Sequence, residues 1–296
     1  MSEAAAGDVW TIARLLGWTR QFLEQRGIES PRLCAEILLA HALGCSRLDL
    51  FTRYESAPAA AQLAAFRELV RLAGTGQPIA YLTGRREFFS LAFEVTPDVL
   101  IPRPETEVLV ERTIDLLRRL ELAEARVLDV CTGSGCVGLS LAWRLPRASV
   151  CASDISEAAL AVARRNAQRL GLEQRVTFAA GDLLAPWSGR QFDVIVCNPP
   201  YIGLDEAAEL APGVRDFEPH VALFAGADGL DLLRRLATET PAVLAPGGHL
   251  LTEVGYRQAP AVRDLLDAAG WADIVTYKDD LRHERVVHAR RAAPEE

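Results

Sequence analysis

From residue 126 onward, short apolar segments alternate with stretches that have helical periodicity. Apolar runs of this length are typical of strands buried on both faces, and intervening helices connect such strands in parallel. The sequence therefore predicts an α/β fold with a doubly wound, mostly parallel sheet. Its seven predicted strands lie at 126–131, 149–153, 175–179, 192–197, 249–254, 272–276 and 285–289.

The first 75 residues have a different pattern. Apolar residues recur at helical spacing from Ile12 onward, Ser30 followed by Pro31 is typical of a helix start, and Gly44 of a helix end. Between 76 and 104, near-alternation of apolar residues and several prolines predict a hairpin-like linker. We expect a small helical bundle domain at 1–75, the linker at 76–104 and the sheet domain at 105–296.

Composition limits the classes of function. A net charge of −8 argues against a broad nucleic-acid-binding surface. The six cysteines include no Cys-x-x-Cys pair and the five histidines have no metal-ligand spacing, so no metal site is expected. The sequence has neither a signal-peptide pattern nor an apolar run of membrane-spanning length. We therefore expect a monomeric cytoplasmic protein that contacts neither a membrane nor nucleic acid.

A glycine-rich loop follows the first predicted strand of the sheet. Gly133 and Gly135 allow a ligand to approach the backbone, because neither carries a Cβ. Asp154, at the end of the next strand, is placed to accept hydrogen bonds from ribose hydroxyls. The loop therefore indicates an adenosine cofactor, although a glycine-rich turn without a ligand remains an alternative. Because the spacing to Gly138 also satisfies the dinucleotide fingerprint, the loop alone leaves NAD open.

Asn198, Pro199, Pro200 and Tyr201 follow the fourth predicted strand. Two consecutive prolines cannot continue a strand ladder, so the chain leaves the sheet at the edge where α/β sheets bind ligands. The Asn198 side chain and the Pro199 carbonyl are neutral acceptors that suit a planar NH2 group beside an aromatic ring. This pattern favours a methyltransferase acting on an amino or amide nitrogen, although in isolation a Pro-rich turn capped by Asn is commoner.

Two features favour S-adenosyl-L-methionine over NAD as the cofactor. Asp182 and Leu183 follow the third predicted strand, where they can contact the amino group and the ring face of an adenine. The proline-containing loop then lies where a methyl acceptor has to face the methyl donor. Nothing in the sequence supports hydride transfer comparably.

Taken together, these motifs resemble the protein-(glutamine-N5) methyltransferases, specifically the release factor glutamine methyltransferase family. The resemblance covers nearly the whole chain and also includes segments 77–84, 87–89, 101–107, 217–219 and 279–286. It implies a Rossmann-like methyltransferase sheet, S-adenosyl-L-methionine as cofactor, and a helical N-terminal domain that helps to bind the substrate protein. The implied partners are peptide chain release factors, whose Gly-Gly-Gln loop carries the methylated glutamine and acts in translation termination.

The resemblance also assigns the site residues. Those implied in cofactor binding are Cys131, Thr132, Gly133, Ser134, Gly135, Asp154, Asp182, Leu183 and Asn198. Those implied in substrate binding are Asn198, Pro199, Pro200, Tyr201, Arg103, Glu105 and Thr106, with Asn198, Pro199 and Tyr201 as the catalytic residues. At two positions the chain departs from the family, which often has glycine at Cys131 and a bulkier aromatic residue at Leu183.

Alternative interpretations remain open for the role of the 103–106 segment and for the function of the protein. The segment from Arg103 to Thr106 is also explained as an ordinary helix start, because an acidic first turn after a proline favours the helix dipole. Other functions are methylation of a ribosomal-protein glutamine, which the 103–106 segment disfavours, and DNA adenine-N6 methylation, which the acidic composition disfavours. An inactive cofactor-binding scaffold is the third, and the presence of Asp154 and Asn198 weighs against it.

Overall fold

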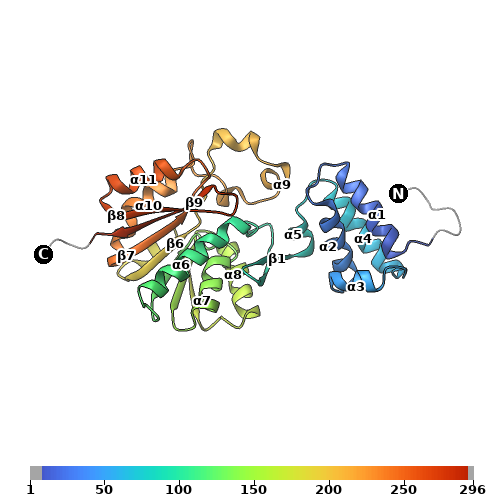
Figure 1. Ribbon diagram of the computed structural model, residues 1–296, viewed down its shortest axis with the longest axis horizontal. Helices are drawn as coiled ribbons and strands as arrows, with labels where there is room; N and C mark the ends of the chain where they lie inside the picture. The colour runs from blue at the N-terminus through green and yellow to red at the C-terminus, as the bar shows by residue number, and fades with distance from the viewer. Residues whose placement is uncertain (1–8, 293–296) are drawn as a thin grey trace. The chain divides into compact units, whose positions relative to one another are not determined.

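The computed structural model describes residues 9–292 (Figure 1). Contacts divide the chain into two compact units. One ends at Gly84 and includes Ala211–Phe217, and the other consists of Arg85–Leu210 and the residues from Glu218 onward.

The first unit is a bundle of helices, as the sequence predicted. Its helices are α1 (Ile12–Glu24), α2 (Pro31–Leu43), α3 (Arg47–Thr52), α4 (Ala60–Ala73), α5 (Ile79–Thr83) and α9 (Pro212–Arg215). Leu23, Leu38 and Phe66, from α1, α2 and α4, are buried together in its core. The predicted helix start is correct in position but not in mechanism: Ser30 has a left-handed backbone, with φ of 49°, and its side chain makes no capping hydrogen bond.

The second unit contains a seven-stranded sheet with the order β5-β4-β3-β6-β7-β9-β8. Its strands are β3 (Arg126–Val130), β4 (Ser149–Asp154), β5 (Val176–Ala180), β6 (Phe192–Cys197), β7 (Leu244–Glu253), β8 (Trp271–Lys278) and β9 (Glu284–Arg291). The first five run parallel, whereas β9 is antiparallel to both of its neighbours. All seven predicted strands are present, and the doubly wound, mostly parallel sheet is confirmed. Two further strands, β1 (Arg85–Phe88) and β2 (Leu91–Glu94), pair with each other.

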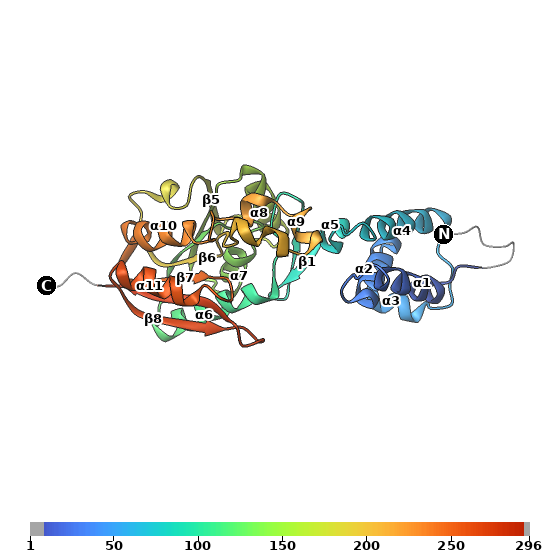
Figure 2. The same cartoon turned by 90° about the horizontal axis from the view of Figure 1, so that it is seen from above.

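Helices cover both faces of this sheet (Figure 2). They are α6 (Glu107–Arg119), α7 (Cys136–Arg144), α8 (Glu157–Arg169), α10 (Asp231–Glu239) and α11 (Ala259–Ala268). Single-turn 3-10 helices are η1 (Pro104–Thr106), η2 (Ala185–Trp187), η4 (His220–Ala222) and η5 (Thr240–Ala242), and η3 (Leu204–Glu209) is longer.

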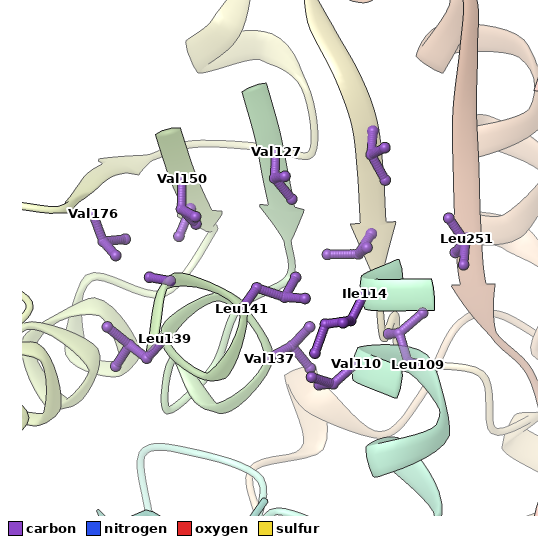
Figure 3. Close-up of a cluster of buried hydrophobic side chains, with 14 of the residues drawn as sticks. Leu109, Val110, Ile114, Val127, Val137, Leu139, Leu141, Val150, Val176 and Leu251 are labelled. Carbon is purple, nitrogen blue, oxygen red and sulfur yellow. The ribbon is translucent and has the colours of Figure 1, made fainter. Parts of the chain in front are cut away.

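Consecutive residues of each central strand enter two different hydrophobic clusters. Val127 of β3 points toward α6 and α7, where it packs in a cluster with Ile114 and Leu141 (Figure 3). Its neighbour Leu128 belongs to the cluster on the opposite face, which includes Leu233 of α10. Since successive strand residues point to opposite faces, this division explains why the strands read as continuous apolar runs.

Within residues 9–292, no helix combines the length and the apolar character that crossing a membrane requires.

The sheet contains a buried pair of histidines on neighbouring strands. His249 of β7 and His288 of β9 are 8% and 6% exposed, and His249 Nδ1 lies 3.0 Å from His288 Nε2. Burial lowers the pKa of both rings below 6.5, and that of His288 to about 4. Both rings are therefore neutral in the folded protein at neutral pH.

This pair should make the stability of the fold sensitive to mild acid. Below about pH 6.5 the histidines of the unfolded chain take up protons that the folded pair resists. The stability that the neutral pair contributes is therefore fully present above that pH and is lost as the pH falls toward 4. Asp129 and Glu253, whose pKa values are raised to about 7, act in the opposite direction between pH 7 and pH 5, so the contribution of the histidines is read from a comparison with His288→Gln. On going from pH 7 to pH 5, the free energy of unfolding measured by urea denaturation should change about 1–2 kcal/mol less favourably in the parent than in His288→Gln. The same change in both proteins would show that His288 does not contribute.

Candidate active site

A cavity of about 450 Å³ lies at the carboxyl ends of β3, β4, β5 and β6, entirely within the second unit. Its size is in the range of small-molecule sites. Of the predicted site residues, it is lined by Arg103, Thr106, Cys131, Thr132, Gly133, Ser134, Asp154, Asp182, Leu183, Asn198 and Pro200. Four others, Glu105, Gly135, Pro199 and Tyr201, are outside this lining.

The glycine loop between β3 and α7 has a backbone that few residues tolerate. Cys131, Gly133 and Gly135 have φ values of 59°, 53° and 83°, in the left-handed region that favours glycine. A Cβ at Gly135 would also lie 2.9 Å from Leu139 Cδ1. Gly135 therefore allows the loop to pack closely against Leu139 of α7, and it does not line the cavity.

A buried carboxyl group occupies the amino end of α7. Asp129 Oδ2 accepts hydrogen bonds from the Gly138 amide, at 2.8 Å, and from the Thr132 hydroxyl, at 2.5 Å. A Cβ at Gly138 would lie 2.9 Å from this same oxygen. Burial raises the pKa of Asp129 to about 7, against the effect of these hydrogen bonds. The Gly138 amide of the fingerprint is thus already engaged by a side chain of the protein, whereas in dinucleotide sites the helix amino end binds a phosphate.

Asp154 connects the end of β4 to the glycine loop. Its Oδ2 accepts the Gly133 amide at 2.8 Å, and its Oδ1 accepts the Ser156 amide at 2.9 Å. Burial raises the pKa of Asp154, while the backbone hydrogen bonds act to lower it. Each carboxylate oxygen still has a lone pair available, so the group can both hold the loop and accept from a ligand hydroxyl.

Asp182 lines the cavity and forms an ion pair. Arg235 of α10 donates to both of its carboxylate oxygens, each at 3.0 Å. The neighbouring Leu183 is buried, with a left-handed φ of 47°. Arg235 also lines the cavity, but no sequence pattern singles it out, because its i,i+4 pairing with Glu239 is typical of an ordinary surface pair.

The tetrapeptide after β6 is fixed by side chains from three other elements. Asn198 Nδ2 donates to Thr106 Oγ1 at 3.2 Å, and the Tyr201 hydroxyl donates to Glu253 Oε1 at 3.2 Å. Gln258 Nε2 donates to the Tyr201 carbonyl at 2.8 Å. The asparagine amide is therefore held in one orientation at the cavity wall, while Tyr201 is directed toward the core.

Glu253 was missed by the sequence analysis because it ends an apolar strand and belongs to no motif. It is 1% exposed, and burial raises its pKa to about 7. The Tyr201 and Thr106 hydroxyls and the positive charge of Arg285 act in the opposite direction. An ionisable group of this kind, behind a binding cavity, is a candidate functional residue.

Arg103 is held by a second residue that the sequence analysis did not assign a role. Its guanidinium pairs with Glu218 Oε1 at 2.5 Å, and Glu218 Oε2 accepts the Ile101 amide at 3.2 Å. Since Glu218 is buried, this pair fixes the segment that leads into η1 and places Arg103 at the cavity.

Known proteins resemble this chain over nearly its whole length. The PrmC N-terminal domain model matches residues 14–84, and the methyltransferase small domain model matches residues 108–211. The release factor glutamine methyltransferase of Rhodopirellula baltica is 43% identical over 99% of this chain and 100% of the relative. The chain belongs to the release factor glutamine methyltransferase family.

Other release factor glutamine methyltransferases agree with this assignment. The one from Geobacter sulfurreducens is 43% identical over 96% of this chain and 98% of its own length. Among solved structures, the hMettl16 catalytic domain in complex with the MAT2A 3′UTR hairpin 1 has a TM-score of 0.55, covering 83% of this chain and 88% of that one. At 16% identity, this likeness shows the fold alone. The family interpretation and the methyltransferase class that the sequence indicated are confirmed.

Proposed function

We propose that this enzyme transfers a methyl group from S-adenosyl-L-methionine to the side-chain amide nitrogen (N5) of a glutamine. The substrate is the glutamine in the Gly-Gly-Gln loop of peptide chain release factors, and the methylation modulates translation termination. The observation that carries the proposal is Asn198, whose neutral side-chain amide is fixed by Thr106 at the wall of the cavity.

The residues of the cavity suit S-adenosyl-L-methionine in charge and shape. Asp129 and Asp154 line the cavity and offer carboxyl oxygens to the sulfonium and ammonium groups of this cofactor, whereas the charge of Asp182 is balanced by Arg235. The glycine loop leaves open space at Gly133, where a Cβ would meet no atom within 4 Å. We assign the methionine portion to residues 131–134, with Gly135 supporting the loop, the ribose to Asp154, and the adenine to the wall formed by Leu183 and the Asp182–Arg235 pair.

Asn198 and Pro199 orient the substrate amide. An amide nitrogen is a poor nucleophile because its lone pair is delocalised into the carbonyl, so catalysis depends mainly on positioning. The bound cofactor supplies an electrophilic methyl group. Asn198 Oδ1 and the Pro199 carbonyl accept the two amide hydrogens and hold the nitrogen in line with that group. Neutral acceptors do this without placing an unpaired charge in the cavity.

The remaining predicted residues act around this centre. Pro200 and Arg103 line the route by which the glutamine enters, and Tyr201 supports the loop through its bond to Glu253. Glu105, outside the cavity lining, is available to the flanking residues of the substrate loop. The helical unit, which matches the PrmC N-terminal domain, helps to bind the release factor.

The decisive experiment uses the purified protein with a methyl-labelled cofactor. It is incubated separately with a release factor, with the same factor carrying Gln→Ala in its Gly-Gly-Gln loop, with a ribosomal-protein fraction and with duplex DNA. We expect label on the intact factor alone. Label on both forms of the factor would assign the reaction to a different residue, and label on ribosomal protein or DNA would replace the proposed substrate.

A further inference from the structure

The guanidinium of Arg235, on α10, is held between two carboxylate groups. Its Nη1 and Nη2 donate to the two oxygens of Asp182, each at 3.0 Å. Its Nε and Nη2 donate to the two oxygens of Glu239, at 2.7 and 3.3 Å. A guanidinium has five N–H groups, all of them in its plane. Carboxylates of the protein therefore occupy four of the five, along both edges that can form a bidentate pair.

The same residue lines the cavity, so this arrangement limits what it can bind there. Because both of its bidentate edges are engaged, Arg235 is not available to pair with a carboxylate or phosphate of a ligand in the way typical of arginine. The two faces of the guanidinium carry no N–H groups and are not used by these ion pairs. A flat guanidinium face binds aromatic rings by stacking.

We propose that Arg235 stacks on the adenine base of the bound cofactor and determines specificity for a planar base. The inference rests on the cofactor of the proposed function and adds a ligand contact made by a ring face instead of by hydrogen bonds. Leu183, the other side chain of this wall, is aliphatic and 5% exposed, so it offers a packing surface without π electrons.

The surroundings of Arg235 suit an uncharged planar ligand group. Asp182 and Glu239 balance its positive charge, so the wall does not attract an anion. Asp182 keeps further lone pairs on both oxygens and can accept from an amino group at the edge of the base. The two carboxylates also fix the plane of the guanidinium before a ligand binds, so stacking costs little side-chain entropy.

The test replaces Arg235 with lysine, which keeps the positive charge opposite Asp182 and Glu239 but has no flat face. We expect the Kd for S-adenosylhomocysteine, measured by calorimetric titration, to rise about 5- to 30-fold, the size of a cation–π contact shielded from water. Arg234→Lys is the matched control, because Arg234 is on the same helix, pairs with Asp228 and lies outside the cavity lining. Its affinity should equal that of the parent.

A second ligand separates stacking from a role exerted through Asp182. S-inosylhomocysteine has an oxygen in place of the amino group of the base, so it loses the contact with Asp182 and should bind the parent more weakly. Arg235→Lys should raise its Kd by the same factor as for S-adenosylhomocysteine, because the ring face is unchanged. If Arg235 only oriented Asp182 toward the amino group, the substitution would not affect this ligand.

Each of three results would overturn the stacking contact. Equal affinity of the parent and Arg235→Lys for S-adenosylhomocysteine would remove Arg235 from the base. A loss that is absent for the inosine ligand would make it a positioning residue for Asp182. An equal loss in Arg234→Lys would assign the effect to the helix.

These titrations contain no methyl acceptor, so they are independent of the proposed substrate. A parent that binds S-adenosylhomocysteine but methylates no release factor would contradict the proposed function, while the two ligands still decide the role of Arg235. A parent that does not bind S-adenosylhomocysteine would overturn both the cofactor assignment and the stacking contact.

Discussion

Replacing Asn198 with alanine should lower kcat for release factor methylation by about 100- to 1,000-fold, the effect of removing one preorganised hydrogen-bonding group from an active site. Alanine cannot accept a hydrogen from the substrate amide, so its nitrogen is no longer aligned. Because Asp154 and the glycine loop are untouched, the affinity for S-adenosylhomocysteine should stay within about 3-fold of the parent. Single-turnover methylation and calorimetric titration measure the two quantities.

The two measurements, kcat and the affinity for S-adenosylhomocysteine, distinguish lost positioning of the substrate from general damage to the fold. Asn198 Nδ2 makes one side-chain hydrogen bond, to Thr106, so we expect Asn198→Ala to lower the thermal midpoint only slightly. If kcat is retained, the glutamine amide must be held elsewhere. If cofactor affinity falls as much as kcat, Asn198 belongs to the cofactor site rather than to the acceptor site.

Replacing Asp154 with alanine should weaken cofactor binding more than it lowers kcat, the reverse of the effect expected for Asn198→Ala. The variant loses the acceptors of the Gly133 and Ser156 amides and the proposed partner of the ribose hydroxyls. Hydrogen bonds to a charged group contribute about 1.5–3 kcal/mol each, so the Kd for S-adenosylhomocysteine should rise by about 100-fold. At saturating cofactor, kcat should fall much less than in Asn198→Ala.

Asp193→Ala is the matched control for this substitution. Asp193 lies near the opposite end of the sheet, where it pairs with Arg126 Nη2 at 2.6 Å, outside the cavity lining. It should bind S-adenosylhomocysteine with the affinity of the parent. Equal affinity in Asp154→Ala and Asp193→Ala would remove Asp154 from the cofactor site.

The sheet could be predicted because each strand carries its own signal. Val127 and Leu128 are both apolar since the two faces of β3 are covered, and the diproline after Cys197 marks where β6 ends. The order of the strands depends on contacts between distant segments, which no local pattern encodes, whereas the reversed direction of β9 follows from the short connection, residues 279–283, that joins it to β8.

The cavity could be predicted only in part, for a related reason. Asp154 and Asn198 follow strands, so their place at the carboxyl edge of the sheet follows from topology. Arg235 and Glu253 sit in an ordinary helix and an apolar strand, and only the fold brings them to Asp182 and Tyr201. The sequence predicted an aromatic ring beside the substrate at Tyr201, and the structure adds that its hydroxyl is bound to Glu253 and that the residue is outside the cavity lining.

The carboxyl group of Asp129 has a consequence for how glycine-rich fingerprints are interpreted. This chain satisfies the spacing that elsewhere signals a pyrophosphate, yet its third glycine makes room for a carboxyl group that the protein carries itself. That carboxyl group already accepts from the amide to which a phosphate would bind, so the loop suits a ligand without a pyrophosphate. The sequence sign of this arrangement is an aspartate within the strand, four residues before the first glycine of the fingerprint.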